Sequence, residues 1–596
     1  MKSYGIEMEG EIIIQKVTTL PVWGATDEAR IVYAEDVNKY YIGNDSEWLE
    51  ILTPTLSVAK GGTGAATLAD GGLVIGNDTG AVEVVIAGAA TEVLVGGGAS
   101  TKPAWGTNIP TAVTIGNKYV YRADGTDVPV ADGGTGSSNA ADGFTALKQD
   151  ATSSATGVIE LATNAEVAAF ADESRAVTPE GLGYAMAGVL AYGVQWDEDE
   201  SSPTLTRTGA LAGIAAASSP GNTCLPIQSA MRRCILNDDG TVNYYLSATD
   251  STKKEDGTTA SVLDGTDGQV MVEIPRFAYK YSYVAATNVH SWSISSVLLP
   301  GYEWHPAFYK DGAWVDHRYI GAYEGIGYDD SVSAYIDCGT GAADNWSGTT
   351  IDVANDKLGS VSGFAPMMDE TRDEFRDIAL NRGAGWRQQD YYLTSAVQLL
   401  YLVEYASFYS QSVIGMGRTE LSGGTWVKDS YIGVTGKSNA DGNATANTGG
   451  NTNAAYMSYR GIENFYGNIY QWIDGFNIYD NIPYVSNVGT DFADDTATGT
   501  GGTYTRLTDT GGSGITLYNA NDYQSTLEQT KGGFLPSAGG GGTNTYITDY
   551  YYQAAGWRVA NFGGYATVTG IAGAFYWYLH TAAADDAVTI GSRLAF

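Results

Sequence analysis

The sequence predicts a multidomain chain in which a β-rich, repetitive first third precedes a larger α+β region. The chain has 596 residues, enough for several domains. A glycine-rich segment with short apolar runs at a fixed spacing extends to about residue 190, and aromatic residues become frequent after it. Hydrophobic residues make up 43% of the chain, with 13 Trp and 41 Tyr, so a wholly disordered chain is excluded.

The charge balance is strongly acidic. Lys+Arg number 32 and Asp+Glu number 68, for a formal net charge of −36. Nucleic acids and anionic membranes need a basic partner surface, so neither is expected as a direct partner. The sequence contains no run of 18 apolar residues, so no membrane-spanning helix is predicted. Its first residues lack the apolar core of a signal peptide, so no signal peptide is expected. The three cysteines (Cys224, Cys234 and Cys338) are too few for a disulfide framework or a zinc module.

Residues 1–55 contain short β-rich runs separated by polar turns. Strands are predicted at Arg30–Tyr33, Lys39–Ile42 and Glu47–Leu49. Such a β-module is too small to bury much core by itself.

Residues 56–136 form an internal repeat. Short strands ending in glycine, at Leu73–Gly76, Val93–Gly96 and Val113–Gly116, start 20 residues apart. This fixed period predicts a repetitive structure whose units bury apolar side chains against neighbours or other chains. A flexible Gly/Ser/Thr linker is the alternative, but linkers have no reason to keep strands at a fixed spacing.

Residues 137–190 change to a mixed pattern. A strand is predicted at Thr156–Thr163, followed by short helices that begin after Asn164 and after Thr178.

Residues 191–596, called the head below, contain ten of the 13 tryptophans. Apolar residues at three- and four-residue spacing predict a helix at Tyr392–Tyr409, and a second helix is predicted at Thr371–Arg382. The Gly/Thr/Asn/Asp-rich stretches 435–455 and 494–516 are predicted to be long surface loops.

Segments of the first third resemble phage tail-fibre proteins. They are the β-module at Ala29–Ile51, the glycine-rich frame containing GLVIGNDTG, and TGVIELATNAEVAAFADESRAVTPEGL at 156–182. The resemblance implies a homotrimeric fibre of the virion, made in the host cytoplasm. It also assigns 1–55 to attachment to phage tail or baseplate proteins, 56–136 to the shaft and 137–190 to the neck.

The head resembles a different group of proteins. ENFYGNIYQWIDG at 463–475 and GWRVA at 556–560 resemble motifs of the formylglycine-generating-enzyme-like branch of C-type lectin folds. The last 25 residues, 572–596, resemble the variable region of receptor-binding proteins diversified by retroelements. The resemblance implies a C-type-lectin-like receptor-binding head with a variable region at 556–596.

Within that region, several runs follow neither a strand nor a helix period, so burial does not dictate their residue types. Every residue in these runs can arise from an Asn codon by changes at its adenines, a test that ordinary loop residues of a Lys- and Gln-poor chain would also pass. The receptor-contacting residues predicted from these runs are Asn561, Phe562, Tyr565, Ala566, Thr567, Val568, Thr569, Ile571, Tyr578, His580, Thr581, Asp585, Asp586, Ala587, Val588 and Thr589.

Catalysis is not expected. Formylglycine-generating relatives need a reactive cysteine pair near the C-terminal core, and no cysteine follows Cys338. His305 and His317, with Asp316, are either metal ligands or structural residues, and the second interpretation is favoured. The acids around Thr371 are interpreted as helix caps.

The predicted function is therefore adhesion to a host-surface glycan or protein, without catalytic residues, metal or cofactor. The alternative is a tail-associated depolymerase that degrades host capsule or lipopolysaccharide.

Overall fold

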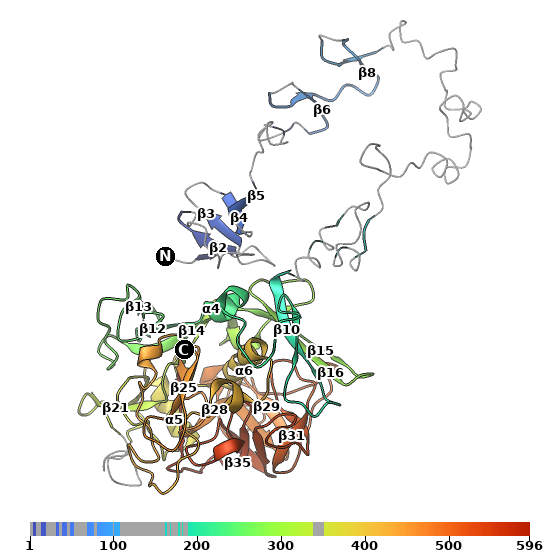
Figure 1. The fold of residues 1–596 in the computed structure, drawn as a ribbon. Coiled ribbons are helices and arrows are strands. Elements are labelled where there is room, and N and C mark those ends of the chain that lie inside the picture. The colour runs from blue at the N-terminus through green and yellow to red at the C-terminus, as the bar shows by residue number, and fades with distance from the viewer. Residues whose placement is uncertain are drawn as a thin grey trace. The chain divides into compact units, whose positions relative to one another are not determined.

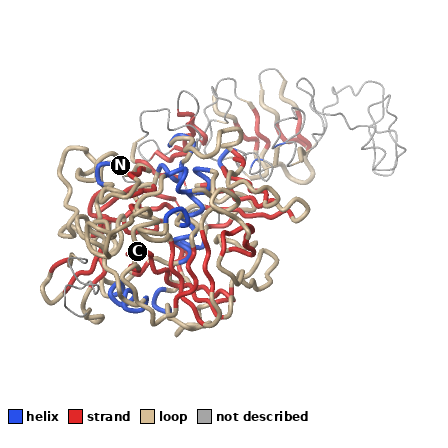
Figure 2. Tube along the Cα trace, turned by 60° about the horizontal axis from the view of Figure 1, so that its bottom comes forward, coloured by secondary structure: helices blue, strands red, loops and turns tan. Residues whose placement is uncertain are grey.

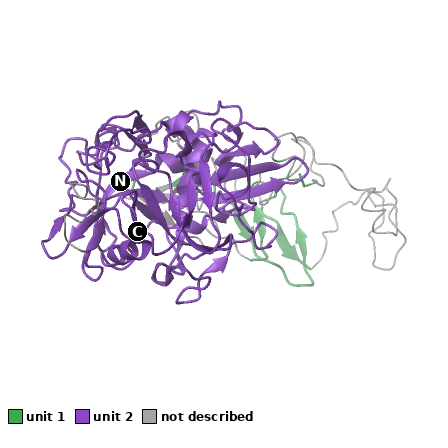
Figure 3. Cartoon of the chain, turned by 90° about the horizontal axis from the view of Figure 1, so that it is seen from below, with its two compact units in different colours: residues 1–4, 15–185 green, residues 5–14, 186–596 purple. Residues whose placement is uncertain are grey.

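The computed structural model describes residues 189–337 and 351–596 without interruption (Figure 1). Before residue 189 the described residues are 4–6, 14–19, 31–34, 39–43, 48–52, 63, 68, 70–76, 80–98, 101–107, 161–163, 167, 177–178 and 182. The chain divides into two compact units, one of residues 1–4 and 15–185 and one of residues 5–14 and 186–596 (Figure 3).

The N-terminal strands form one small sheet in the order β1-β2-β3-β4-β5. Its strands are β1 (Tyr4–Ile6), β2 (Ile14–Val17), β3 (Ile31–Ala34), β4 (Lys39–Gly43) and β5 (Trp48–Leu52). The last three correspond within a few residues to the three strands predicted from β-rich runs, which are thereby confirmed. β1 and β2 were not predicted.

The repeat segment contains two antiparallel hairpins. β6 (Leu73–Ile75) pairs with β7 (Glu83–Val85), and β8 (Val93–Val95) pairs with β9 (Ala104–Gly106). Two of the three predicted repeat strands are thus confirmed. The third, at 113–116, lies outside the described residues, as do almost all of the residues in the strand and helices predicted over 156–182.

The head, predicted to be α+β, is built mostly from β-sheets and contains few helices (Figure 2). The largest sheet has nine strands in the order β30-β29-β28-β34-β35-β33-β31-β32, with β36 paired to β28. These strands are β28 (Tyr470–Tyr479), β29 (Ile482–Val485), β30 (Thr505–Arg506), β31 (Asp522–Leu527), β32 (Pro536–Gly539), β33 (Tyr550–Gln553), β34 (Trp557–Phe562), β35 (Trp577–Thr581) and β36 (Ile590–Gly591).

Two further large sheets complete the framework of the head. The six-stranded sheet, in the order β13-β12-β14-β20-β37-β24, comprises β12 (Arg232–Leu236), β13 (Val242–Tyr245), β14 (Gln269–Pro275), β20 (His317–Gly321), β24 (Arg387–Gln388) and β37 (Leu594–Ala595). The five-stranded sheet, in the order β11-β10-β16-β15-β17, comprises β10 (Ala191–Asp197), β11 (Thr206–Gly209), β15 (Ala278–Val284), β16 (Val289–Ser295) and β17 (Glu303–Trp304).

The described part of the head also contains small sheets and α-helices. The small sheets are formed by β18 (Tyr309–Lys310) and β19 (Ala313–Trp314); by β21 (Ile326–Asp329), β22 (Ala334–Tyr335) and β23 (Lys357–Gly359); and by β25 (Ala446–Thr448), β26 (Tyr456–Tyr459) and β27 (Ile462–Glu463). The α-helices of the head are α4 (Pro226–Ser229), α5 (Arg372–Leu380), α6 (Tyr391–Tyr405) and α7 (Ser410–Ile414). No helix in the described part of the chain is long and apolar enough to cross a membrane.

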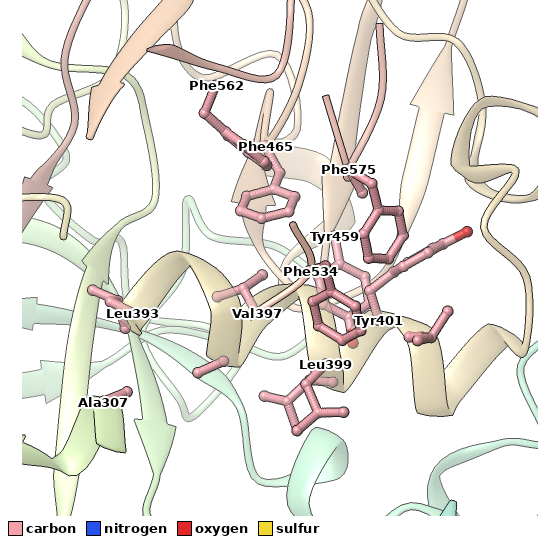
Figure 4. Close-up of a cluster of buried hydrophobic side chains, with 14 of the residues drawn as sticks. Ala307, Leu393, Val397, Leu399, Tyr401, Tyr459, Phe465, Phe534, Phe562 and Phe575 are labelled. Carbon is pink, nitrogen blue, oxygen red and sulfur yellow. The ribbon is translucent and has the colours of Figure 1, made fainter. Parts of the chain in front are cut away.

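Helix α6 lies in the main hydrophobic core. Nearly all of its residues are buried, as expected of a helix that is packed on all sides. Figure 4 shows its side chains against aromatic rings from the β-strands and their connections, with labels on Leu393, Val397, Leu399, Tyr401, Tyr459, Phe465, Phe534, Phe562 and Phe575. Asp390 caps its first turn by accepting a hydrogen bond from Leu393 N (2.8 Å).

The predicted end of this helix, at Tyr409, is wrong. The helix stops at Tyr405 because Ala406 adopts a left-handed conformation (φ 51°), with its N–H bonded to Leu402 O. The chain then turns into the separate short helix α7. The other predicted helix is confirmed within two residues as α5, and Thr371 and Glu374 form its capping box, as the acidic start of the segment indicated.

Most residues of the two segments predicted as long surface loops are exposed or half-buried, and each segment contains one short strand, β25 or β30. A few of their residues are buried, among them Ser438, Tyr504 and Leu507. Some of their polar residues bind buried arginines: Arg233 Nη2 donates to Ser438 Oγ (2.6 Å), and Arg372 forms an ion pair with Asp494. These few polar residues are therefore hydrogen-bond partners of the core, which their composition did not indicate.

Candidate binding pocket at the C-terminal strands

A pocket with a volume of about 510 Å³ opens beside β28, β33, β34 and β35, wholly within the head. Its lining comes from these strands, the loop after β34 and the loop between β35 and β36. The lining residues are Tyr470, Tyr552, Asn561, Tyr565, Val568, Ile571, Tyr578, His580, Thr581, Asp585, Asp586, Ala587, Thr589 and Ile590.

Strand β35 illustrates how the scaffold presents these side chains. Successive strand residues point to opposite faces of a sheet. Trp577 and Leu579 are therefore buried in the core, whereas Tyr578 is half-buried and His580 is exposed at the pocket. β35 pairs in parallel with β33, which places Tyr552 opposite Tyr578.

A double-glycine turn brings the next run of residues back to the pocket. Gly563 and Gly564 both have left-handed backbones (φ 88° and 83°), and a Cβ at Gly564 would lie 2.7 Å from the Cβ of Ala572. The following loop is held by main-chain hydrogen bonds: Leu421 N donates to Ala566 O (2.9 Å), and Ala566 N donates to Asn468 O (3.0 Å). These bonds fix the loop that carries Tyr565 and Val568.

Four tyrosines form an aromatic wall, defined as Tyr470, Tyr552, Tyr565 and Tyr578. The ring centroid of Tyr470 lies 4.8 Å from that of Tyr565 and 5.4 Å from that of Tyr578, and Tyr552 lies 4.9 Å from Tyr578. All of these pairs are tilted, so the wall is concave rather than a flat stack. Burial, with Tyr565 and Asp585 nearby, raises the pKa of Tyr578 above its ordinary value, so its hydroxyl stays protonated at neutral pH.

The polar lining is rich in hydrogen-bond acceptors. Asn561 is fully buried; its Nδ2 donates to Thr581 Oγ1 (2.9 Å), and its Oδ1 has no hydrogen-bond partner among the described residues. Asp585 and Asp586 are exposed, and Asp585 Oδ2 accepts from Ala582 N (2.8 Å). Among the described residues, neither lysine nor arginine lines the pocket.

The structure brings together 11 of the 16 residues predicted from the unpatterned runs. Those at the pocket are Asn561, Tyr565, Val568, Ile571, Tyr578, His580, Thr581, Asp585, Asp586, Ala587 and Thr589. The other five, Phe562, Ala566, Thr567, Thr569 and Val588, do not line it. Residues from three separate runs therefore share one concave surface.

Phe562 and Ala566 are corrections, because they are fully buried and cannot form an exposed surface. Asn561 and Thr581 are also buried, so they are not on an exposed face although they belong to the pocket lining. Phe562 is on the opposite face of β34 from Asn561 and packs against the rings of Phe465 (5.0 Å) and Trp577 (5.3 Å). Ala566 is enclosed by the main-chain bonds that fix the loop. Thr567 and Val588 are half-buried, and Thr569 is exposed, away from the lining.

Three lining residues were not assigned to the site from sequence. Tyr470 belongs to the 463–475 motif, and Ile590 directly follows the predicted run that ends at Thr589. Tyr552 lies in a run of three tyrosines outside the predicted runs. Alternation on β33 separates these three: Tyr551 is buried, while Tyr550 and Tyr552 are half-buried. This strand alternation was the sequence signal that could have assigned Tyr552 to the pocket.

The structure does not bring His305, His317 and Asp316 together as a metal site. His305 is fully buried, its Nδ1 accepts from Ala307 N (3.2 Å), and burial lowers its pKa to about 3. His317 is exposed, and Asp316 pairs with Arg276 (3.0 Å). Within the described residues, no group of three or more His, Cys, Asp or Glu is placed to hold a metal ion.

Comparisons with known proteins give little similarity. No family model matches the chain, and no curated protein matches it. Among solved structures, a chain titled "Major Tropism Determinant P3c Variant" is 11% identical with a TM-score of 0.21, covering 95% of this chain and 94% of that chain. A chain titled "Major Tropism Determinant M1 Variant" is 11% identical with a TM-score of 0.20, covering 97% and 95%. At these values neither similarity carries an inference about this chain.

Proposed function

We propose that this chain is a phage tail-fibre adhesin that binds a host-surface glycan or protein through the pocket at β35. One observation carries the proposal. Three runs without a strand or helix period in the sequence contribute side chains to one pocket, many of them half-buried or exposed, and core residues such as Trp577 and Leu579 hold the strands that carry them. The resemblance of the first third to tail-fibre modules supports the location in the virion and the attachment of residues 1–55 to the phage tail.

The arrangement suits a variable C-type-lectin-like head. Exposed positions such as His580 and Asp586 can change with little effect on stability, since surface substitutions usually alter it by less than about 0.5 kcal/mol. Tyrosine and asparagine in the lining provide large contact area and adaptable hydrogen bonds at low entropic cost, as in antibody paratopes. These features support diversification of residues 556–596 by a retroelement.

Adhesion is proposed in preference to cleavage. Glycoside hydrolysis needs a carboxylic acid kept protonated by apolar surroundings and a second carboxylate across the scissile bond. Among the described lining residues the carboxylates are Asp585 and Asp586, which are adjacent in sequence and both exposed to water. Glu370, whose pKa burial raises to about 8, interacts with Asp586 but is not part of the lining. Release of oligosaccharide from host capsule or lipopolysaccharide by the purified protein would favour the depolymerase instead.

A homotrimer is part of the proposal, and the two described hairpins support association between copies. They expose Leu73, Val74, Ile86 and Val93, with 38–71% of each side chain accessible in the single chain. An isolated two-stranded hairpin is only marginally stable in water, so burial against equivalent hairpins of other copies would stabilise the shaft.

We therefore expect a mass in solution of three times the 62.9 kDa of one chain. The variant Val74→Asp/Ile86→Asp/Val93→Asp should shift the protein toward smaller species, because charge would be introduced into the buried contact. The control variant Ile214→Asp/Val284→Asp/Val332→Asp alters exposed apolar residues of the head and should leave the mass unchanged. A monomeric wild-type protein would refute the trimer.

A photo-cross-linking experiment tests the adhesin proposal. A benzophenone amino acid at position 580, at the pocket, should form an adduct with a host-surface molecule on intact cells. The same group at position 317 replaces another exposed histidine of the head, outside the pocket, and should form none. Adducts from position 317 alone, or equal adducts from both positions, would place receptor contact elsewhere.

A further inference from the structure

The charges around the pocket restrict the ligand it can hold. Two carboxylates, Asp585 and Asp586, belong to the lining, and among the described lining residues His580 is the only basic side chain. Glu370 lies close enough to Asp586 for their charges to interact, and its pKa is raised to about 8, mainly by burial and by Glu374. A carboxylate, sulfate or phosphate on the ligand would therefore meet like charge from Asp585 and Asp586, and no lysine or arginine of the described lining would balance it.

The buried amide of Asn561 adds a directional requirement. Its Nδ2 donates to Thr581, while its Oδ1 is buried and has no hydrogen-bond partner among the described residues; Asn561 itself belongs to the pocket lining. Leaving a buried acceptor unsatisfied is unfavourable. An N–H or O–H donor supplied by a ligand would satisfy this acceptor, whereas a ligand that presents only acceptors would not.

The aromatic wall favours positive charge over a merely neutral donor. A cation near the faces of tyrosine rings is attracted by their quadrupoles, and the attraction is stronger where water is excluded. The ring of Tyr470 is tilted against those of Tyr565 and Tyr578, with centroids about 5 Å away, and all three residues line the pocket, so a compact group in the pocket would meet aromatic rings from more than one segment. Acidic side chains beside such rings provide the complementary charge.

From these three observations we propose that the pocket recognises an ammonium group, carried either by an amino sugar or by a lysine side chain of the receptor. This inference rests on the proposed receptor-binding function of the pocket. The ammonium would lie against the aromatic wall, donate a hydrogen bond to Asn561 Oδ1, and be balanced in charge by Asp585 and Asp586. The net charge of −36 would also attract a cationic ligand over long range.

Binding of small soluble probes to the full-length protein tests the proposal by titration calorimetry or ligand-observed NMR. One pair is glucosamine and N-acetylglucosamine, and the other is Nα-acetyl-lysine amide and its Nε-acetylated form. Within at least one pair we expect the amine to bind about tenfold more tightly than its acetylated partner. The pair with the larger difference identifies the sugar or the peptide source. Added salt should weaken binding of the amine.

Matched variants locate the charge effect. Asp586 is exposed and makes no hydrogen bond or ion pair with another described residue, so Asp586→Asn should leave the fold intact and weaken amine binding severalfold. Glu200→Gln removes an exposed acid of the head outside the pocket and should not change amine binding.

Equal affinity for amines and acetylated partners, no binding of either amine in the millimolar range, or equal effects of Asp586→Asn and Glu200→Gln would each overturn the ammonium proposal. The adsorption of intact phage to host cells is measured in a separate experiment, because it concerns the adhesin proposal and not the ammonium proposal. Failure of the probes combined with receptor cross-linking from position 580 would reject the charge assignment and leave the adhesin proposal standing. Failure of the cross-linking would reject the adhesin proposal itself.

Discussion

Replacing Trp577 by alanine should strongly destabilise the head. The indole is fully buried, packs against Phe562 (5.3 Å), Phe476 (5.8 Å) and Tyr391 (5.9 Å), and donates from Nε1 to Phe534 O (3.1 Å). Truncating such a residue costs about 3–5 kcal/mol through lost burial and the cavity left behind. This is a large part of the roughly 5–15 kcal/mol that stabilises a typical domain. The melting midpoint of the head, followed by near-ultraviolet circular dichroism, measures the loss.

Trp557 provides the control in the neighbouring strand. It is only partly buried and packs against Tyr479, itself an exposed residue, at 4.7 Å. Trp557→Ala should therefore cost about 1 kcal/mol and leave the near-ultraviolet spectrum close to that of the wild type. If the two substitutions lower the midpoint equally, the nine-stranded sheet does not have its core at β35.

Helices and strands could be predicted from the sequence where neighbouring residues alone specify them. α5 follows from the acidic run at its start, and the hairpin strands follow from apolar runs that end in glycine. The end of α6 could not be predicted, because a left-handed Ala406 has no local sequence signal: alanine is the residue that most favours helix. The contacts of Ser438 and Asp494 with buried arginines could not be predicted for another reason. Their arginine partners, Arg233 and Arg372, are more than a hundred residues away in sequence.

Part of the candidate site could also be predicted from local sequence patterns. The lack of a burial period marked the runs after β34 and β35, and most of their residues line the pocket. Phe562 was misassigned because one strand carries both a pocket residue and a core residue on its two faces. Tyr470 and Tyr552 reach the pocket only through the pairing of β28 with β34 and of β33 with β35, which no local pattern encodes.

The central claim, that the pocket at β35 contacts the receptor, leads to a large expected effect on adsorption. The variant Tyr565→Ala/Tyr578→Ala/His580→Ala removes two rings of the aromatic wall and the exposed imidazole. Tyrosines at the centre of an interface commonly contribute 2 kcal/mol or more each, or about thirtyfold in affinity per residue. We therefore expect adsorption to fall by more than about a thousandfold. Some stability should also be lost, since both tyrosines are half-buried and pack against Tyr470.

Two controls separate binding from folding. Tyr565→Phe/Tyr578→Phe keeps the rings and should retain most of the adsorption. Tyr309→Ala/Trp314→Ala/His317→Ala removes two exposed rings and an exposed histidine of the same head, outside the pocket.

The most direct measurement is the rate at which phage carrying each variant adsorb to host cells, at a temperature where every head is folded. The pocket variant should lose adsorption while the remote variant adsorbs like the wild type. Normal adsorption by the pocket variant, or an equal loss in the remote variant, would contradict the assignment of the receptor site.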